Sequence, residues 1–203
     1  SAYRAASLAG ARWALGPGPF RVRSLFAFTE TSSLACMIEW LKEEYASAPA
    51  DAPELLIGTA YNYVEALDRG ELRPLAPGSL VIETGGYKGR TREVLKAVLY
   101  AQLSAALAVP EERIIAEYGM CELSSPLWEK PGARGFRPAG WTRVRLVDPE
   151  TLADCDRGLI ALYDPANLES GVGILTGDVG VFLAGGRLGL EGRLAGVEPR
   201  GCS

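Results

Sequence analysis

The sequence predicts an α/β fold in which a parallel sheet with flanking helices is followed by a smaller, β-rich part. Three observations lead to this prediction. Short apolar runs alternate with helical patterns in the first part, helical periodicity disappears after residue 130, and glycine turns then divide a series of short strands. Strands that alternate with helices form parallel βαβ units, whereas short strands divided by turns favour antiparallel pairing. We therefore expect two parts, residues 1–130 and 131–203.

The first part contains a strand–helix–strand–helix–strand series that follows an amphipathic helix. Residues 31–47 place their apolar residues on one helical face, with Ser32 or Ser33 as the N-cap. Gly70 is a typical residue to close the helix that precedes it. The predicted helices are 31–47, 60–70 and 90–107, and the predicted strands are 54–59, 79–84 and 113–119. In the helix at 90–107, the apolar stripe is Val94, Val98, Leu99, Leu103 and Leu107.

The second part consists of short apolar segments separated by glycines. The predicted strands are 141–148, 158–164, 173–178, 180–186 and 187–193. This pattern indicates an antiparallel or mixed sheet, such as a small distorted barrel.

Composition excludes several classes of function. The 203 residues carry a net charge of −4 and no stripe rich in lysine and arginine, so we expect no nucleic-acid partner. No run of 18 apolar residues occurs, so we expect no membrane span, and the first residues lack the layout of a signal peptide. The chain has no histidine, which excludes Ser-His-Asp and Cys-His catalysis within it. Four widely spaced cysteines without a CxxC pair favour a reducing, cytoplasmic setting.

Two motifs follow neighbouring predicted strands. Gly85-Gly86-Tyr87-Lys88 comes after the strand at 79–84, and Tyr118-Gly119-Met120-Cys121-Glu122 lies at the end of the strand at 113–119. Ligands of open α/β sheets bind at this edge, and paired glycines allow a ligand to approach the backbone. Tyr118 could stack on a purine and Glu122 could bind Mg²⁺. The alternative is a tight turn without a ligand, a packed aromatic ring and a solvated glutamate.

Two further segments contain candidate binding and reactive groups. Asp178, in a turn after Thr176-Gly177, could accept hydrogen bonds from two ribose hydroxyls, although such turns also arise for local reasons. Cys202 follows Arg200, and a nearby arginine lowers the pKa of a thiol. A free terminal cysteine without a role is the alternative.

Taken in order, these motifs resemble those of the adenylate-forming ligase superfamily, which activates carboxylic acids as acyl-adenylates. YGMCE is similar to its YGxTE motif, TGD to its TGD motif, and Gly192-Arg193 to the GR near its interdomain hinge. More narrowly, TGGYKG, YGMCEL, LTGDVG and the final RGCS resemble the acyl-protein synthetases of bacterial luminescence and their relatives. The resemblance begins near residue 24 and implies the large-domain fold of these ligases.

The resemblance also implies roles for individual residues. It places Tyr118 on adenine, Asp178 on ribose, Glu122 on Mg²⁺ and Arg193 near the nucleotide at the hinge, with Cys202 as the acyl acceptor. Around the nucleotide and the acyl group it places these further residues: Gly85, Gly86, Tyr87, Gly119, Met120 and Cys121. ATP and Mg²⁺ are the implied cofactors, a long-chain fatty acid is the implied substrate, and an acyl-reductase or carrier protein is the implied partner.

The chain departs from the family pattern at three points. Cys121 replaces the usual threonine of YGxTE, and the Ser/Thr/Gly-rich phosphate loop is not in this chain. The C-terminal domain that carries the adenylation lysine of the superfamily is not in this sequence either. We therefore expect the latter part of a ligase or a shortened relative. The alternatives are an aryl- or acyl-CoA ligase and a non-catalytic domain that binds a nucleotide or a partner protein.

Overall fold

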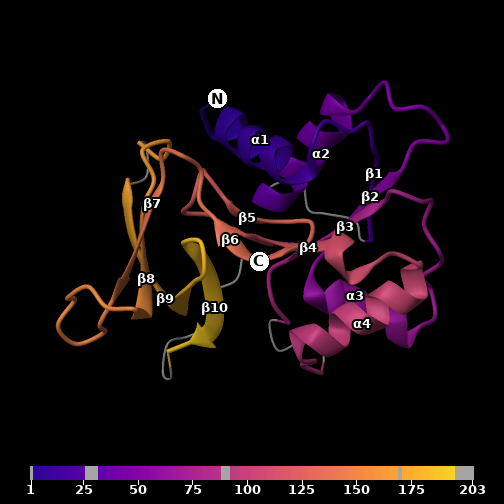
Figure 1. Ribbon diagram of the computed structural model, residues 1–203. Coiled ribbons are helices and arrows are strands. Elements are labelled where there is room, and N and C mark those ends of the chain that lie inside the picture. The colour runs from indigo at the N-terminus through magenta and orange to yellow at the C-terminus, as the bar shows by residue number, and fades with distance from the viewer. Residues whose placement is uncertain (1, 26–31, 88–91, 169–170, 195–203) are drawn as a thin grey trace.

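The computed structural model describes residues 2–25, 32–87, 92–168 and 171–194 (Figure 1). Its helices are α1 (Ala2–Leu15), α2 (Ser33–Glu44), α3 (Ala60–Asp68), α4 (Lys96–Leu107) and the 3₁₀ helix η1 (Glu111–Arg113). Its strands are β1 (Arg21–Ser24), β2 (Glu54–Gly58), β3 (Leu80–Thr84), β4 (Ile114–Tyr118), β5 (Leu127–Lys130), β6 (Ala133–Arg137), β7 (Arg143–Val147), β8 (Arg157–Tyr163), β9 (Gly173–Leu183) and β10 (Arg187–Arg193). In the described part of the chain, no helix is long and apolar enough to cross a membrane.

The described strands form one ten-stranded sheet, in which neighbouring strands are hydrogen-bonded in the spatial order β1-β2-β3-β4-β5-β6-β10-β9-β8-β7. The first four strands pair in parallel, and every later pair is antiparallel. The prediction of an α/β fold with a parallel sheet, flanking helices and a β-rich part is confirmed. Antiparallel pairing already begins with β5, before residue 130, and the division into two domains stays a prediction.

Helices cover both faces of the parallel strands, with α1 and α2 on one face and α3 and α4 on the other (Figure 1). Alternation along each strand sends side chains to the two faces in turn. In β3, Ile82 packs in the core under α1 and α2, whereas Val81 packs under α3 and α4. A third core connects β4 to the β-rich part and includes Tyr118, Phe136 and Leu188.

Both helix-end predictions are confirmed. Ser32 is the N-cap of α2, because its hydroxyl accepts a hydrogen bond from the Ala35 backbone N–H over 3.1 Å. Gly70 directly follows the C-cap of α3 and has a φ of 65°, a conformation that glycine adopts without steric cost.

The helix predicted at 90–107 is shorter than expected. It begins at Lys96, because the backbone of Leu95 is extended, with φ −56° and ψ 135°. Val94 therefore precedes the helix and packs only partly against the core, and Val98 is 45% exposed. The rest of the predicted stripe is buried: Leu99, Leu103 and Leu107. Residues 90 and 91 lie outside the described residues.

Two strand predictions merge, and five elements have no counterpart in the predictions. The segments 173–178 and 180–186 form the single strand β9, because β8 and β10 both pair with it at Val179 and Gly180, where the predicted strands were separated. The elements without a prediction are α1, β1, η1, β5 and β6. Helix α1 buries mainly small residues, such as Ala11 and Ala14, so it lacks the stripe of large apolar side chains that identifies a helix.

Candidate functional site

Three residues predicted for the site meet where β4, β9 and β10 lie close together. The Tyr118 hydroxyl donates a hydrogen bond to Asp178 Oδ2 over 2.7 Å, and Arg193 Nε lies 3.0 Å from Asp178 Oδ1. Tyr118 and Asp178 are 60 residues apart in the sequence. This Tyr118–Asp178–Arg193 cluster therefore joins the end of a parallel strand to the β-rich part.

Strand pairing sets the position of Asp178 and Arg193. The two residues face each other in the antiparallel pair of β9 and β10, beyond a register shift between Leu190 and Gly192. Opposite charges at facing positions of an antiparallel pair stabilise the sheet. The Asp178 side chain is 21% exposed and the Arg193 side chain 36% exposed, so the cluster reaches the surface.

The Thr176-Gly177-Asp178 motif lies within β9, so the prediction that it forms a turn at a strand end is wrong. The Thr176 hydroxyl donates to the Ile160 carbonyl over 3.0 Å and accepts from the Asp178 backbone N–H over 3.1 Å. These bonds lie next to a register shift in the pairing with β8 and replace regular ladder bonds there. Thr176 consequently fixes the backbone of Asp178 within the strand.

Tyr118 is packed rather than open. Its side chain is 8% exposed, and its ring lies 5.8 Å from the Phe136 ring between centroids, at an interplanar angle of 52°. Burial raises the pKa of Tyr118, and the negative charge of Asp178 raises it further. The phenol thus remains protonated and donates to Asp178. Stacking of Tyr118 on a purine stays a prediction.

The glycine pair follows β3, directly beside the end of β4. Thr84 and Glu117 are register partners, so Gly85 and Tyr118 follow neighbouring positions of the same sheet edge. Gly85 and Gly86 are exposed, and a Cβ at either position would have no atom within 4 Å. The backbone is therefore open to a ligand at this point.

Tyr87 has a different environment from the two glycines before it. Its hydroxyl donates to the Val94 carbonyl over 2.8 Å, and its ring packs against the core under α3 and α4. Burial raises the pKa of Tyr87. Tyr87 thus anchors the connection to α4, and its predicted contact with the nucleotide stays a prediction.

The residues after Tyr118 form a turn at the surface. The Leu123 backbone N–H donates to the Met120 carbonyl over 3.1 Å, and Met120 packs partly against the third core. Gly119, Cys121 and Glu122 are exposed. Glu122 forms no ion pair with any residue that the structure describes. Its carboxylate is therefore available to a ligand.

A buried hydrogen-bond network fixes the segment that follows Glu122. Asp164, which is fully buried, accepts from the Ser125 backbone N–H over 2.7 Å and from the Ser125 hydroxyl over 2.8 Å. Asn167 Nδ2 donates to the Glu122 carbonyl. The loop between β8 and β9 thus fixes the backbone around Glu122.

Two buried residues beside the site were not predicted. The Thr84 hydroxyl donates to Glu117 Oε2 across the β3–β4 pair. Burial raises the pKa of Glu117 to about 7, and the Thr84 hydrogen bond opposes this shift only in part. The Glu117 carboxylate also lies against Gly119, where a Cβ would collide with Oε1. The signal in the sequence was a glutamate within the apolar run IIAEY.

A second buried carboxylate, that of Glu83 in β3, lies on the face of the sheet that α3 and α4 cover. Burial raises the pKa of Glu83 to about 7, although Lys96 and the Tyr100 hydroxyl favour its charged form. The Tyr100 hydroxyl donates to Glu83 Oε2 over 3.2 Å, and Lys96 Nζ lies 4.0 Å from the same oxygen. This network connects α4 to the strand that ends at the glycine pair.

The predicted metal ligand, Glu122, belongs to the described residues, whereas the predicted acceptor thiol, Cys202, does not. Within the described ranges, no group of three or more acidic or cysteine side chains could hold a metal ion by itself. An Mg²⁺ ion bound through one carboxylate and substrate phosphates needs no such group, and Glu122 fits that mode. Cys202 and Lys88 lie outside the described residues, so the predicted acceptor role of Cys202 stays a prediction.

Comparison with solved structures identifies the architecture. The chain is similar to the anthranilate CoA ligase AuaEII in complex with anthranoyl-AMP, with 18% sequence identity and a TM-score of 0.66. It is also similar to ATP-bound MatB from Rhodopseudomonas palustris, with 17% identity and a TM-score of 0.67, and to the amide bond synthetase McbA from Marinactinospora thermotolerans, with 18% identity and a TM-score of 0.63. The chain has the fold of the adenylate-forming ligases.

These matches include nearly all of this chain but less than half of each solved structure. They cover 95% of this chain, 43% of AuaEII and 44% each of MatB and McbA. No protein-family model matches the chain, and no curated protein does. The chain thus corresponds in fold to one part of these ligases.

Proposed function

We propose that this chain forms the nucleotide-binding part of a ligase that activates a carboxylic acid as an acyl-adenylate. The observation that carries the proposal is the Tyr118–Asp178–Arg193 cluster, which lies next to the open backbone of Gly85 and Gly86. The comparisons add support, because AuaEII is described with anthranoyl-AMP and MatB with ATP. In this proposal, ATP and a carboxylic acid are the two substrates.

Asp178 and Arg193 would bind the ribose side of the nucleotide. Each carboxylate oxygen of Asp178 already accepts one contact from the protein, and each retains a further lone pair for a ribose hydroxyl. Tyr118 and Arg193 keep the carboxylate in one orientation before the nucleotide arrives, which lowers the entropy lost on binding. The remaining edge of Tyr118 would form the wall beside adenine, with Gly119, Met120 and Cys121 continuing that wall.

Glu122 would hold Mg²⁺ together with the substrate phosphates. When bound, the ion would offset negative charge on the phosphates during transfer. The chain contributes the carboxylate and its fixed backbone, which Asn167 holds from the neighbouring loop. Gly85 and Gly86 would admit the phosphates and the acyl group close to the main chain, because neither glycine has a neighbour within 4 Å of a Cβ.

The proposed reaction has two steps. A carboxylate oxygen of the acid attacks the α-phosphorus of ATP, the bond to the β-phosphate oxygen breaks, and pyrophosphate leaves. A thiolate then attacks the acyl carbon, forms a thioester and releases AMP. We propose a long-chain fatty acid as the substrate and Cys202 as the acceptor. Coenzyme A with an aryl or acyl acid is the alternative, as is the thiol of an acyl-reductase or carrier protein.

Release of pyrophosphate tests the first step. We expect the complete gene product to release pyrophosphate with ATP, Mg²⁺ and a fatty acid, and Asp178→Ala to reduce the rate by at least tenfold (about 1.4 kcal/mol). The matched control is Asp156→Ala, which changes an exposed aspartate. Absence of pyrophosphate release with both fatty and aromatic acids would overturn the ligase proposal.

A non-catalytic nucleotide-binding domain is the second candidate. It would be supported if the protein binds ATP but releases no pyrophosphate, and if Asp178→Ala weakens the binding of ATP. The replacement of the motif threonine by Cys121 favours this second candidate.

Transfer of labelled acid tests the acceptor. Incubation with radiolabelled fatty acid and ATP should label the protein, and Cys202→Ser should abolish the label without affecting pyrophosphate release. A label that persists in Cys202→Ser would exclude Cys202 as the acceptor. Dependence of the thioester on added coenzyme A would support the CoA ligase alternative.

A further inference from the structure

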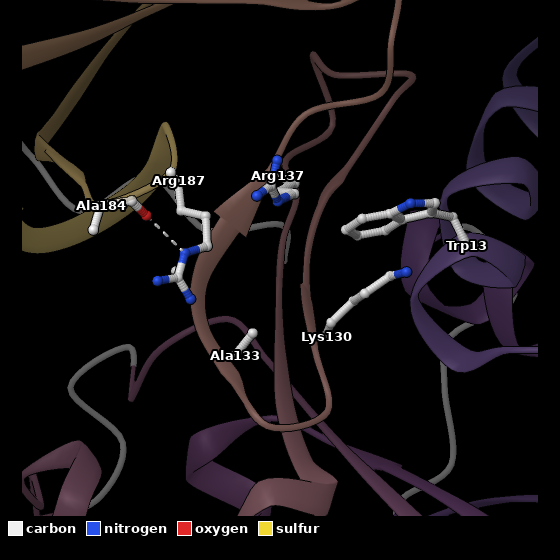
Figure 2. A pocket seen from close by; sticks show the side chains of 8 residues that line it. Trp13, Lys130, Ala133, Arg137, Ala184 and Arg187 are labelled. Atoms are coloured by element: carbon white, nitrogen blue, oxygen red, sulfur yellow. Dashed lines mark hydrogen bonds between the residues drawn. The ribbon is translucent and has the colours of Figure 1, made fainter.

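A hollow lined by positive charge lies on the β-rich side of α1, away from the Tyr118–Asp178–Arg193 cluster. Its volume is about 480 Å³, and Figure 2 shows Trp13 and Lys130 on one side, Arg187 on the other and Arg137 between them. The remaining lining residues are Ala133, Gly135, Ala184 and Gly185. Arg187 begins β10 and Arg193 ends it, so the hollow and the cluster lie toward opposite ends of one strand.

The three cations of the hollow form no ion pair with a carboxylate in the described part of the chain. Most arginines and lysines that the structure describes lie within 4.0 Å of a carboxylate, but Lys130, Arg137 and Arg187 do not. Among the residues that the structure describes, no acidic one lines the hollow, although the whole chain has a net charge of −4. Like charges gathered at one place repel each other, and a bound anion would remove that repulsion.

Local structure holds these side chains at the hollow. Arg187 Nε donates to the Ala184 carbonyl over 3.1 Å, which leaves the two terminal guanidinium nitrogens for another acceptor. Lys130 Nζ lies 4.2 Å from the centroid of the Trp13 ring, a cation–π contact. Alternation along β5 turns Glu129 to the opposite face, where it lies near Lys96 and Arg134. The neighbouring acid therefore does not neutralise Lys130.

Gly135 forms part of the floor and allows β10 to approach. It has a φ of 91°, and a Cβ there would lie 2.8 Å from Leu183 Cδ1 and 3.1 Å from Arg187 Cβ. Any larger residue at position 135 would thus push Arg187 outward. The close approach of β6 and β10 brings Arg137 and Arg187 to one hollow.

We infer that this hollow binds the phosphate chain of a small polyanion. Guanidinium groups match phosphate oxygens with paired hydrogen bonds, and Lys130 adds a further positive charge. The hollow is open to solvent, and its volume of about 480 Å³ is sufficient for a small molecule. Pyrophosphate, inorganic tripolyphosphate and the phosphates of a nucleotide share this chemistry. The inference does not depend on the proposed ligase activity.

Calorimetric titration with inorganic tripolyphosphate tests the site. We expect one molecule to bind per chain, and Arg137→Gln/Arg187→Gln to raise the dissociation constant by at least about tenfold per lost guanidinium, as expected for charge-assisted hydrogen bonds. The control is Arg73→Gln/Arg143→Gln, which removes the same charge from two exposed arginines outside the hollow that also form no ion pair with a described carboxylate. This control should change the dissociation constant less than about twofold.

Three results would overturn the inference: no binding of tripolyphosphate, unchanged binding in Arg137→Gln/Arg187→Gln, or equal weakening in the control. Circular dichroism of each variant establishes that a loss of binding is not a loss of folding. Titration of Gly86→Leu with tripolyphosphate and ATP separates this hollow from the proposed nucleotide site, because the new side chain would occupy the proposed position of the phosphates and lies outside the hollow. Tripolyphosphate binding should remain in that variant. Tighter binding of ATP than of tripolyphosphate, with a difference that Trp13→Phe removes, would show that the hollow also recognises the base of a nucleotide. Equal affinities for the two ligands would show that the hollow recognises the phosphate chain alone.

Discussion

The Tyr118 hydroxyl donates a hydrogen bond to Asp178 Oδ2 over 2.7 Å and thereby connects the parallel sheet to the β-rich part of the chain. Arg193 contacts the other oxygen of the same carboxylate. The contact joins two motifs that the sequence presents separately, YGMCE and TGD. Asp178 is thus oriented from both parts of the fold before any ligand binds.

Tyr118→Phe should weaken this connection without removing the packing of the ring. We expect the free energy of unfolding to fall by about 1 kcal/mol, the usual net contribution of one hydrogen bond. If Asp178 binds ribose, the dissociation constant for ATP should also rise, by about tenfold for each 1.4 kcal/mol of lost orientation. Urea unfolding and ATP titration measure the two effects. Tyr163→Phe, at a half-exposed tyrosine of β8, is the control and should change neither quantity. An unchanged unfolding free energy in Tyr118→Phe would contradict the prediction.

Gly119→Ala should destabilise the chain through one collision. The new Cβ would meet the Glu117 carboxylate, which lies against the turn after β4. We expect a loss of about 1–3 kcal/mol, typical of overpacking. Gly140→Ala is the matched control, because a Cβ at Gly140 has no atom within 4 Å, and its effect should stay within about 0.5 kcal/mol.

A double-mutant cycle identifies the cause of the Gly119 effect. Glu117→Ala removes the carboxylate, so Gly119→Ala should cost less in that background than in the parent chain. Equal costs in the two backgrounds would show that the collision with Glu117 is not responsible.

The stability of the chain should fall as the pH rises toward neutrality, partly because of Glu117. Burial raises its pKa in the folded state from 4.5 to about 7, so the folded state holds the proton more tightly than the unfolded state. The resulting stabilisation is fully present below pH 4.5 and is lost as the pH rises through 7. Glu83 has the same direction of shift and the same pH window.

Glu117→Gln removes this titration and keeps a side-chain oxygen for the Thr84 hydroxyl. We expect the difference in unfolding free energy between about pH 5 and about pH 8 to shrink by about 2 kcal/mol, at about 1.4 kcal/mol per pKa unit. Urea unfolding at the two pH values measures this difference. Glu71→Gln, at an exposed glutamate, should leave it unchanged. The same pH dependence in Glu117→Gln and the parent chain would exclude Glu117 as a contributor.

The sequence predicted the α/β class because periodicity and buried strands are properties of neighbouring residues. It also led to Tyr118, Asp178 and Arg193, although not to their mutual contact, which depends on the pairing of β9 with β10. Helix α1 was not predicted, because its buried residues are mostly small, and the pattern of large apolar residues is the usual signal. The Thr176-Gly177-Asp178 segment was predicted as a turn, because the local sequence does not show the pairing with β8 and β10 that continues β9 beyond it, nor the hydrogen bond from Thr176 to Ile160.

Asp164→Asn should loosen the segment that carries Glu122. Asp164 is fully buried and accepts hydrogen bonds from both the backbone N–H and the hydroxyl of Ser125. An asparagine offers only one acceptor oxygen, so one buried donor would lose its partner, at a cost of about 1–3 kcal/mol. Urea unfolding measures this cost, and hydrogen exchange of the amides at 123–125 should become faster by more than the change in global stability requires. Asp156→Asn, at an exposed aspartate, is the control. If exchange in Asp164→Asn increases only in step with global unfolding, Asp164 contributes stability without positioning Glu122.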